Sequence, residues 1–245
     1  MTRRPPGIVP LARALSKLGV ASRTDARRHI LDGRVTVGGV VVRNPARLVN
    51  PDRADIRVDA VRARRAAWRT IVLNKPRGTV TTRRDPQGRR TVFDVLGDED
   101  EGLVAVGRLD LATSGLLLLT TDTHLADWLT DPANQILRRY VVTVRGRLED
   151  AEAAGMVEGI RGLHAAAVHV RKRSQRETHL IVSLDEGRNR EIRRLCEAAG
   201  HPVTALKRIA FGGIELGTLA PGEWRDVAKA DILRTFGPDA LRRAG

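Results

Sequence analysis

The sequence contains few of the residues on which several common functions depend. Cys196 is the only cysteine among 245 residues, which excludes an internal disulfide framework and a zinc site built from several cysteines. The six histidines are scattered and form neither a His-Glu-x-x-His motif nor a Cys/His pair at ligand spacing, so no metal site is predicted. The glycine-rich segments match neither a Walker motif nor GxGxxG, and no cofactor is expected.

Long apolar runs are also absent. No segment approaches the roughly 20 apolar residues of a membrane span, and the basic N-terminal stretch, residues 1–7, is not followed by the apolar segment of a secretory signal. At 42% hydrophobic residues, the chain has enough apolar side chains to bury a core. We therefore expect a soluble, cytoplasmic and monomeric protein without a membrane partner.

Positive charge is in excess. The chain has 43 lysines and arginines against 29 aspartates and glutamates, a formal net charge of +14, and such a surface attracts polyanions. The excess is concentrated near the N-terminus: residues 1–70 carry 16 basic and 5 acidic side chains, and residues 71–245 carry 27 and 24. Arginines number 38 of the 43, and their planar fork suits phosphate. Nucleic acid is the expected partner.

Residues 8–60 predict a compact unit of two helices and a small sheet. Leucines at helical spacing over residues 11–18 predict the first helix, which a glycine ends. Ser22 is a suitable N-cap for the second helix. Arg23 and Arg27 share the exposed side of that helix, and we predict that they contact RNA.

The remainder of the chain mixes strands and helices without a regular βαβ alternation, which predicts an α+β fold centred on a sheet. Residues 61–69 are rich in Arg and Ala and indicate a linker or a charged helical connection before a second domain over residues 70–240. We predict strands over residues 35–37, 40–42, 56–58, 70–73, 103–106, 116–119, 140–144, 167–171 and 179–184, and helices over residues 148–157, 188–199 and 228–236.

A polar connection over residues 107–115 joins two apolar segments of strand length. It contains Asp110, a carboxylate that such a loop can hold rigidly and partly away from water, which suits covalent or electrostatic work at an electron-poor carbon. On spacing alone, the simpler interpretation is a turn aspartate that caps the backbone. Ser114 lacks the flanking glycines of a nucleophile elbow and is not a candidate nucleophile.

Four motifs follow one another along the chain. They are Asn-Lys-Pro-Arg-Gly at 74–78, Gly-Arg-Leu-Asp at 107–110 with Thr-Ser-Gly at 113–115, Arg-Tyr at 139–140, and Glu-Gly-Arg-Asn-Arg-Glu-Ile-Arg-Arg at 186–194. Together they closely resemble the RsuA/RluB/RluE/RluF family of ribosomal RNA pseudouridine synthases. The resemblance covers nearly the whole chain, because residues 8–60 also resemble the RNA-binding module named after ribosomal protein S4.

The resemblance implies a catalytic domain with a mixed, largely antiparallel sheet, and isomerisation of a uridine in RNA without a cofactor. The N1–C1′ bond breaks and the ring rejoins the ribose through C5. Asp110 matches the family's catalytic aspartate, which either attacks C1′ or acts as a base at C2′. Tyr140 matches the tyrosine that stacks on uracil. Arg193 matches the arginine that neutralises the carboxylate, and we expect it to pair with Asp110 and lower its pKa.

The resemblance also indicates RNA contacts around the site. We interpret Arg108 as a phosphate clamp on a flipped nucleotide; its alternative is a structural salt bridge under the loop. Lys75 orients the loop or touches the RNA backbone. Arg190 is predicted to reach RNA phosphate, although Glu191, where the family usually has Gln, places a negative charge close to it.

Substrate and function leave alternatives open. Residues 78–92 look more like the RluB branch, which acts on large-subunit RNA, than the RsuA branch, which acts on small-subunit RNA, so 23S rRNA is favoured over 16S rRNA. A second possibility is a noncatalytic RNA-binding factor in ribosome assembly that retains the fold. A third is a glycosidase that uses Asp110 with Asp122 or Asp127, but such a cleft needs aromatic residues, and Trp128 alone is a poor one.

Overall fold

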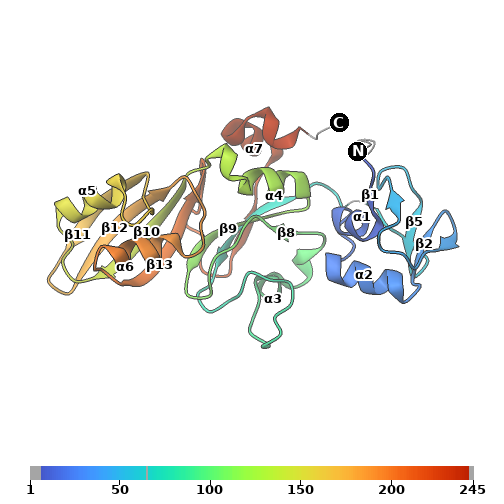
Figure 1. Cartoon of the computed structure of the whole chain (residues 1–245), viewed down its shortest axis with the longest axis horizontal. Helices are drawn as coiled ribbons and strands as arrows, with labels where there is room; N and C mark the ends of the chain where they lie inside the picture. The colour runs from blue at the N-terminus through green and yellow to red at the C-terminus, as the bar shows by residue number, and fades with distance from the viewer. Residues whose placement is uncertain (1–6, 65, 243–245) are drawn as a thin grey trace.

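The computed structural model describes residues 7–64 and 66–242. The N-terminal segment considered above as a secretory signal lies almost entirely outside these residues, as does position 65 of the predicted linker. A small N-terminal unit lies at one end of an elongated molecule, and the β11–β12 hairpin with α5 lies at the other (Figure 1). In the described part of the chain, no helix combines the length and the apolar character needed to cross a bilayer.

The N-terminal unit contains both predicted helices. The Ser22 hydroxyl accepts a hydrogen bond from the backbone N–H of Asp25 at 3.1 Å, so the predicted N-cap of the second helix is confirmed. A four-stranded antiparallel sheet of order β3-β2-β5-β6 packs beside the helices, and β1 pairs with β4. The elements are β1 (Val9–Pro10), α1 (Leu11–Lys17), α2 (Arg23–Leu31), β2 (Val35–Val37), β3 (Val40–Val41), β4 (Leu48–Val49), β5 (Ile56–Val58) and β6 (Val61–Arg62).

This unit has a hydrophobic core of its own, which includes Leu11, Leu15, Ile30 and Ile56. The sheet extends past the predicted start of the linker, because β6 pairs with β5. The linker prediction is therefore wrong at residues 61–62. The described residues between β6 and β7 form neither helix nor strand, so a helical connection is also wrong there.

The larger part of the molecule is built on one mixed sheet. Its main path has the order β11-β12-β10-β13-β9-β7-β15, with β14 beside β13 and β8 beside β9. All its pairs are antiparallel except β9 with β13. The strands are β7 (Thr70–Lys75), β8 (Val104–Ala105), β9 (Ser114–Thr120), β10 (Arg138–Arg145), β11 (Ala167–Arg173), β12 (Glu177–Leu184), β13 (Val203–Phe211), β14 (Ile214–Glu215) and β15 (Trp224–Asp226).

Helices cover both faces of this sheet, and the predicted α+β class is confirmed. The three helices predicted in this part of the chain are present, whereas α3, α4, β13, β14 and β15 were not predicted. The helices are α3 (Val92–Leu96), α4 (Thr123–Thr130), α5 (Asp150–Glu158), α6 (Glu191–Ala198) and α7 (Lys229–Phe236), with 3-10 turns at Gly97–Asp100, Pro132–Asn134 and Pro238–Leu241.

Strand β9 is buried on both faces, which explains its unbroken run of leucines. Leu117 and Leu119 belong to the cluster under α5 and α6, and Leu116 and Leu118 belong to the opposite cluster under α4 and α7. The other predicted apolar strand, over residues 103–106, is shorter than expected: β8 spans two partly exposed residues beside β9. The loop that contains Asp110 therefore leads into the centre of the sheet.

Candidate active site

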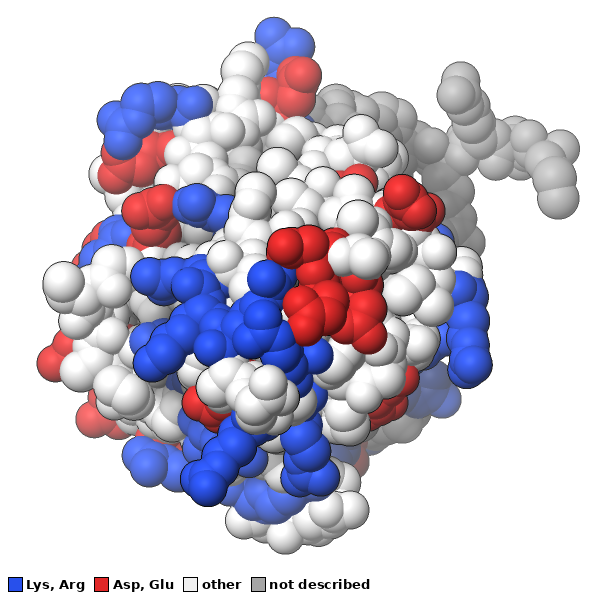
Figure 2. All heavy atoms as spheres, turned by 90° about the vertical axis from the view of Figure 1, so that its left-hand side faces the viewer, with Lys and Arg blue, Asp and Glu red and all other residues white. Residues whose placement is uncertain are grey.

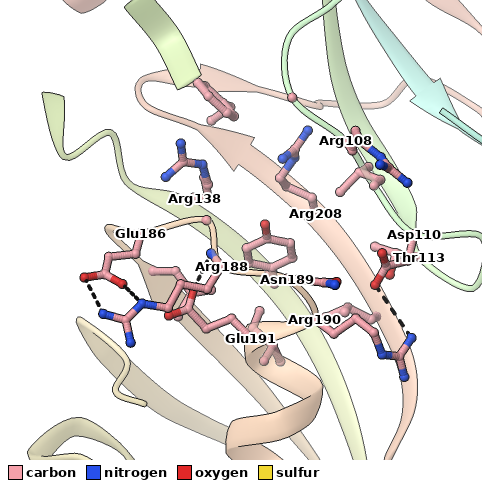
Figure 3. Close-up of a pocket in the computed structure, with 18 of the residues that line it drawn as sticks. Arg108, Asp110, Thr113, Arg138, Glu186, Arg188, Asn189, Arg190, Glu191 and Arg208 are labelled. Atoms are coloured by element: carbon pink, nitrogen blue, oxygen red, sulfur yellow. Dashed lines mark hydrogen bonds and ion pairs between the residues drawn. The ribbon is translucent and has the colours of Figure 1, made fainter. Parts of the chain in front are cut away.

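A pocket of about 830 Å³ opens where β9 and β13 run parallel. The loop over residues 107–113, the loop over residues 186–190 and the start of α6 line it, together with side chains from β10 and β13 (Figure 3). The parallel contact is short, because only Lys207 with Ser114 and Arg208 with Gly115 are paired. The pocket thus lies at the C-terminal end of the 107–113 loop, where the two halves of the sheet meet.

The Asp110 loop is fixed through its backbone. Five successive carbonyl oxygens accept hydrogen bonds from outside or within the loop, so its conformation does not depend on the Asp110 side chain. The pairs are Leu109 with the Thr81 hydroxyl at 2.9 Å, Asp110 with the Thr113 N–H at 2.9 Å, Leu111 with the Gly78 N–H at 2.8 Å, Ala112 with Arg193 Nη2 at 3.3 Å, and Thr113 with Lys75 Nζ at 2.8 Å.

Lys75 has no exposed surface and lies beneath this loop. Its ammonium group donates to the carbonyl oxygens of Thr113 and Pro76, at 2.8 and 3.0 Å. Burial lowers the pKa of Lys75 to about 8, although the nearby Asp110 opposes the shift. The predicted RNA contact of Lys75 is wrong, because RNA cannot reach a fully buried ammonium; the side chain orients the loop.

Gly115 brings the loop and β13 into direct backbone contact. Its φ of +100° lies in a region that favours glycine, and a Cβ at this position would lie 2.1 Å from the carbonyl oxygen of Arg208. Only glycine allows this approach. The Thr-Ser-Gly motif therefore ends in a glycine because any side chain at this position would force the Asp110 loop away from the strand that contains Arg208.

The cation nearest to the Asp110 carboxylate is Arg190, with Nη1 at 3.8 Å from Oδ2 (Figure 3). The predicted pairing of Asp110 with Arg193 is wrong. Arg193 donates instead to the carbonyl oxygens of Ala112 and Val203, at 3.3 and 3.2 Å, and so holds the loop from below. Burial is the main cause that lowers the pKa of Arg193; the charge of Arg190 acts in the same direction, and the charge of Asp110 opposes it.

The difference arises at the start of α6. The helix begins at Glu191, and Arg190 precedes it in a left-handed conformation with φ of +51°. This backbone turn directs Arg190 at Asp110. Glu191 is buried and accepts a hydrogen bond from the Arg188 N–H at 3.0 Å, while burial raises the pKa of its carboxyl. Within the described residues, Glu191 forms no salt bridge with Arg190 or Arg194.

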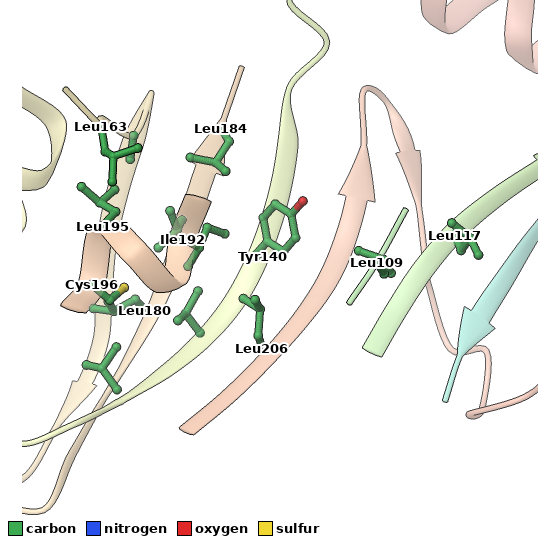
Figure 4. Close-up of a cluster of buried hydrophobic side chains, with 14 of the residues drawn as sticks. Leu109, Leu117, Tyr140, Leu163, Leu180, Leu184, Ile192, Leu195, Cys196 and Leu206 are labelled. Atoms are coloured by element: carbon green, nitrogen blue, oxygen red, sulfur yellow. The ribbon is translucent and has the colours of Figure 1, made fainter. Parts of the chain in front are cut away.

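Tyr140 belongs to both the core and the pocket. It is 8% exposed and shares a buried cluster with Ile192 and Leu206, and Figure 4 shows its ring between Ile192 and Leu109. It also lines the pocket. Arg108 lines the same pocket and is exposed; within the described residues it has no ion pair, so the structural salt bridge considered for it is not found. Arg108 remains available to an anion.

The carboxylates of the glycosidase alternative lie elsewhere. Asp122 caps α4, accepting hydrogen bonds from the N–H groups of His124 and Leu125, and neither Asp122 nor Asp127 lines the pocket. The glycosidase interpretation therefore does not fit. Within residues 7–64 and 66–242, no group of three or more His, Cys, Asp or Glu side chains is arranged to hold a metal ion.

Basic side chains are also placed away from the pocket. Arg23 and Arg27 are exposed on α2, and Arg23 lines a second groove, of about 560 Å³, between the N-terminal unit and the larger part. At the opposite end of the molecule, Figure 2 shows a dense group of lysines and arginines. The β11–β12 hairpin contributes Arg171, Lys172 and Arg176, which are exposed there. The run Arg-Lys-Arg-Ser-Gln-Arg signals this surface in the sequence, but it was not singled out above.

Two buried arginines of the pocket were also not predicted as site residues. Arg138 and Arg208 are 7% and 3% exposed, and both line the pocket. Arg138 lies one residue before the Arg-Tyr motif at 139–140. A buried arginine cannot be recognised from sequence when the strand around it, as in β13, also contains exposed basic residues.

Comparison with known proteins gives consistent matches. The sequence model described as RNA pseudouridylate synthase matches residues 69–198, and the S4 domain model matches residues 9–54. An uncharacterized RNA pseudouridine synthase of Aquifex aeolicus is 36% identical, with 93% of this chain and 94% of the relative covered. The ribosomal large subunit pseudouridine synthase B of Vibrio vulnificus is 37% identical, with 91% and 72% covered. A crystal structure of a pseudouridylate synthase superposes with a TM-score of 0.64 at 24% identity, covering 93% and 99% of the two chains, and so shares the fold.

Proposed function

Because the chain belongs to the RNA pseudouridylate synthase family, we propose that it isomerises uridine to pseudouridine in ribosomal RNA, with Asp110 as the catalytic carboxylate. Relatives named ribosomal large subunit pseudouridine synthase B, from Vibrio and Pseudomonas, support 23S rRNA as the substrate over 16S rRNA. The protein acts in the cytoplasm as a monomer and needs no cofactor.

One observation carries the proposal: a single aspartate faces the pocket from a rigid loop, beside Tyr140 and within 3.8 Å of Arg190. An ionised carboxylate in a partly buried pocket is costly unless a cation compensates it. Arg190 supplies that charge at the carboxylate, and Lys75 and Arg193 hold the backbone on which Asp110 is placed. The reacting group is thus preorganised before substrate binds.

The reaction requires access to C1′ and C5 of the same nucleotide, so the uridine leaves its stack and enters the pocket. The Tyr140 ring packs against the uracil, and the Asp110 carboxylate meets the ribose. Whether Asp110 bonds to C1′ or removes the C2′ proton, the N1–C1′ bond breaks and the uracil turns. C5 then bonds to C1′; in the first route the bond between Asp110 and C1′ breaks in that step, and in the second route Asp110 returns the proton to C2′. C5 then loses its proton and N1 gains one, which leaves an isomer of the starting nucleotide.

RNA is held by surfaces on both sides of the pocket. The N-terminal unit offers Arg23 and Arg27, the pocket rim offers Arg108, and the β11–β12 hairpin offers its own basic group. These cations bind the phosphate backbone without reading sequence. The choice of uridine then depends on the shape of the RNA and on which base can be flipped.

The test is release of tritium from 5-tritiated uridine in unmodified 23S and 16S rRNA. We expect release from 23S rRNA with the parent, near-complete loss with Asp110→Asn, and a large loss with Arg190→Gln. Arg225→Gln is the control, because Arg225 is exposed on β15 and, among the described residues, donates only to the carbonyl oxygens of Glu215 and Asp226. Full release with Asp110→Asn excludes the assigned carboxylate. If the parent releases no tritium from either RNA, the noncatalytic assembly factor is the better interpretation.

A further inference from the structure

Two guanidinium groups are buried side by side in the wall of the pocket. Arg138 of β10 and Arg208 of β13 are 7% and 3% exposed, and both lie over the ring of Phe211, at 5.0 and 5.2 Å from its centroid. Figure 3 shows them with Arg108 along one side of the pocket, while Asp110 and Arg190 lie on another side. The pocket therefore has three arginines along one side and the Asp110–Arg190 pair on another.

Neither buried arginine forms an ion pair. In the part of the chain that the structure describes, no carboxylate lies within ion-pair distance of Arg138 or Arg208, in contrast to Arg188, which pairs with Glu186. Among the described residues, Arg138 donates to the carbonyl oxygens of Ile136 and Asp185, at 3.0 and 3.3 Å.

Arg208 is the less satisfied of the two. Its Nε donates to the carbonyl oxygen of Leu116 at 2.7 Å, whereas its buried Nη2 has no hydrogen-bond partner among the described residues. Burial of a cation that is not ion-paired costs free energy. Burial and the charge of Arg208 lower the pKa of Arg138, and Tyr140, Glu191 and Asp185 oppose this shift. A bound anion would remove this cost.

We propose that Arg138 and Arg208 form a binding site for a phosphodiester group of the RNA strand, adjacent to the uridine in the pocket. Phosphates are the anions of RNA, and a neutral uracil would leave both cations uncompensated. Guanidinium groups bind phosphate oxygens through paired N–H donors. This inference rests on the proposed function, because it places the phosphate beside the uridine that reacts.

The two arginines line the same pocket as Asp110 and Tyr140. Tyr140 is two residues from Arg138 on β10 and is the register partner of Arg208 on β13. The same pair of strands therefore presents the ring that packs on the base and the cations that hold its phosphate. The arginines act as binding residues that keep the nucleotide flipped, so their loss should raise KM much more than it lowers kcat.

The experiment compares Arg138→Gln and Arg208→Gln with the exposed control Arg225→Gln in tritium release. Loss of a charge-assisted hydrogen bond corresponds to a rise in KM of roughly 10- to 100-fold for each variant, with kcat within about threefold of the parent and no change for the control. Arg208→Lys, which keeps the charge, should recover part of the loss. A fall in kcat at unchanged KM overturns the proposal, because it indicates that the arginines act on the reacting base and do not bind the phosphate.

Neutralising the phosphate tests the same contact from the RNA side. Two RNAs are compared, each with a methylphosphonate in place of one of the two phosphates that flank the target uridine. Each substitution should weaken binding by the parent, and one of them should cause no further loss of binding by Arg208→Gln. Equal weakening of parent and variant by both overturns the proposal.

A binding assay without turnover separates this site from the proposed reaction. Uridine 5′- or 3′-monophosphate should raise the melting temperature of the parent more than uridine does, and this difference should disappear in Arg208→Gln and Arg138→Gln but not in Arg225→Gln. A difference that persists in both variants overturns the phosphate site even if tritium is released. A parent that binds the monophosphates but releases no tritium refutes the reaction alone.

Discussion

Replacement of Gly115 by alanine should damage both stability and activity. Gly115 has a φ of +100°, and a Cβ there would lie 2.1, 2.8 and 3.0 Å from the O, N and C atoms of the Arg208 backbone. These are main-chain atoms of a central strand, so no side chain can rotate away. The sheet must separate between β9 and β13, at the pairing that joins its two halves.

The expected cost combines two effects. An L-residue in a left-handed conformation costs about 1–2 kcal/mol, and forced overpacking costs about 1–3 kcal/mol. Their sum, about 2–5 kcal/mol, corresponds to a fall in melting temperature of roughly 5–20 °C for a chain of this size. Urea denaturation and calorimetry of Gly115→Ala measure the two quantities, and tritium release should fall further than the folded fraction because Asp110 and Arg208 move apart.

Gly88→Ala is the matched control. Gly88 also has a positive φ, of +68°, but a Cβ there meets no atom within 4 Å. It should lose only the conformational cost of about 1–2 kcal/mol and keep full activity. If Gly115→Ala is no less stable than Gly88→Ala and retains activity, the close approach of the two strands does not position the site.

Three further outcomes are expected. Burial lowers the pKa of Lys75 from 10.5 to about 8, so between these pH values the unfolded chain binds more protons than the folded chain. The free energy of unfolding of the parent should therefore rise over this window relative to Lys75→Met. Parallel pH profiles of the two proteins in urea titrations would contradict this. Burial raises the pKa of the Cys196 thiol to about 12, so a disulfide reagent at pH 8 should modify it only after unfolding, and rapid modification of the native protein would refute the burial. Changing Arg171, Lys172 and Arg176 to Gln should reduce the slope of log affinity for rRNA against log salt by roughly two to three, as measured by anisotropy, whereas an unchanged slope would exclude the hairpin from the interface.

Local patterns were enough to predict most elements of the fold. The helix α2 follows from the Ser22 cap and its apolar stripe, and β9 follows from its run of leucines. Strand β13 was missed because Lys207 and Arg208 interrupt its apolar pattern. Arg208 is nevertheless buried, since Phe211 and the pocket wall enclose it, and that environment is assembled from distant segments.

The position of the candidate carboxylate could also be predicted, because Asp110 lies in a short motif between two apolar segments. The cation that pairs with Asp110 could not be predicted. The predicted helix begins at residue 188 and therefore includes Arg190, but α6 begins at Glu191 and leaves Arg190 outside the helix. The left-handed backbone of Arg190 then decides which guanidinium reaches Asp110. Likewise, the burial of Lys75 could not be predicted, because it depends on the loops that enclose the side chain.

The charges of the pocket explain why recognition and placement of the uridine depend on the same strands. Arg193 and Lys75 donate to loop carbonyls, and Arg190 lies at Asp110, so none of these cations is available to RNA without disturbing the carboxylate. Arg138 and Arg208 donate to backbone carbonyls and form no ion pair in the described part of the chain. In the proposed site, a phosphate binds these two guanidinium groups, and Asp110 keeps its own partner. Substrate binding and carboxylate stabilisation thus use different arginines, and a variant of one set should leave the other intact.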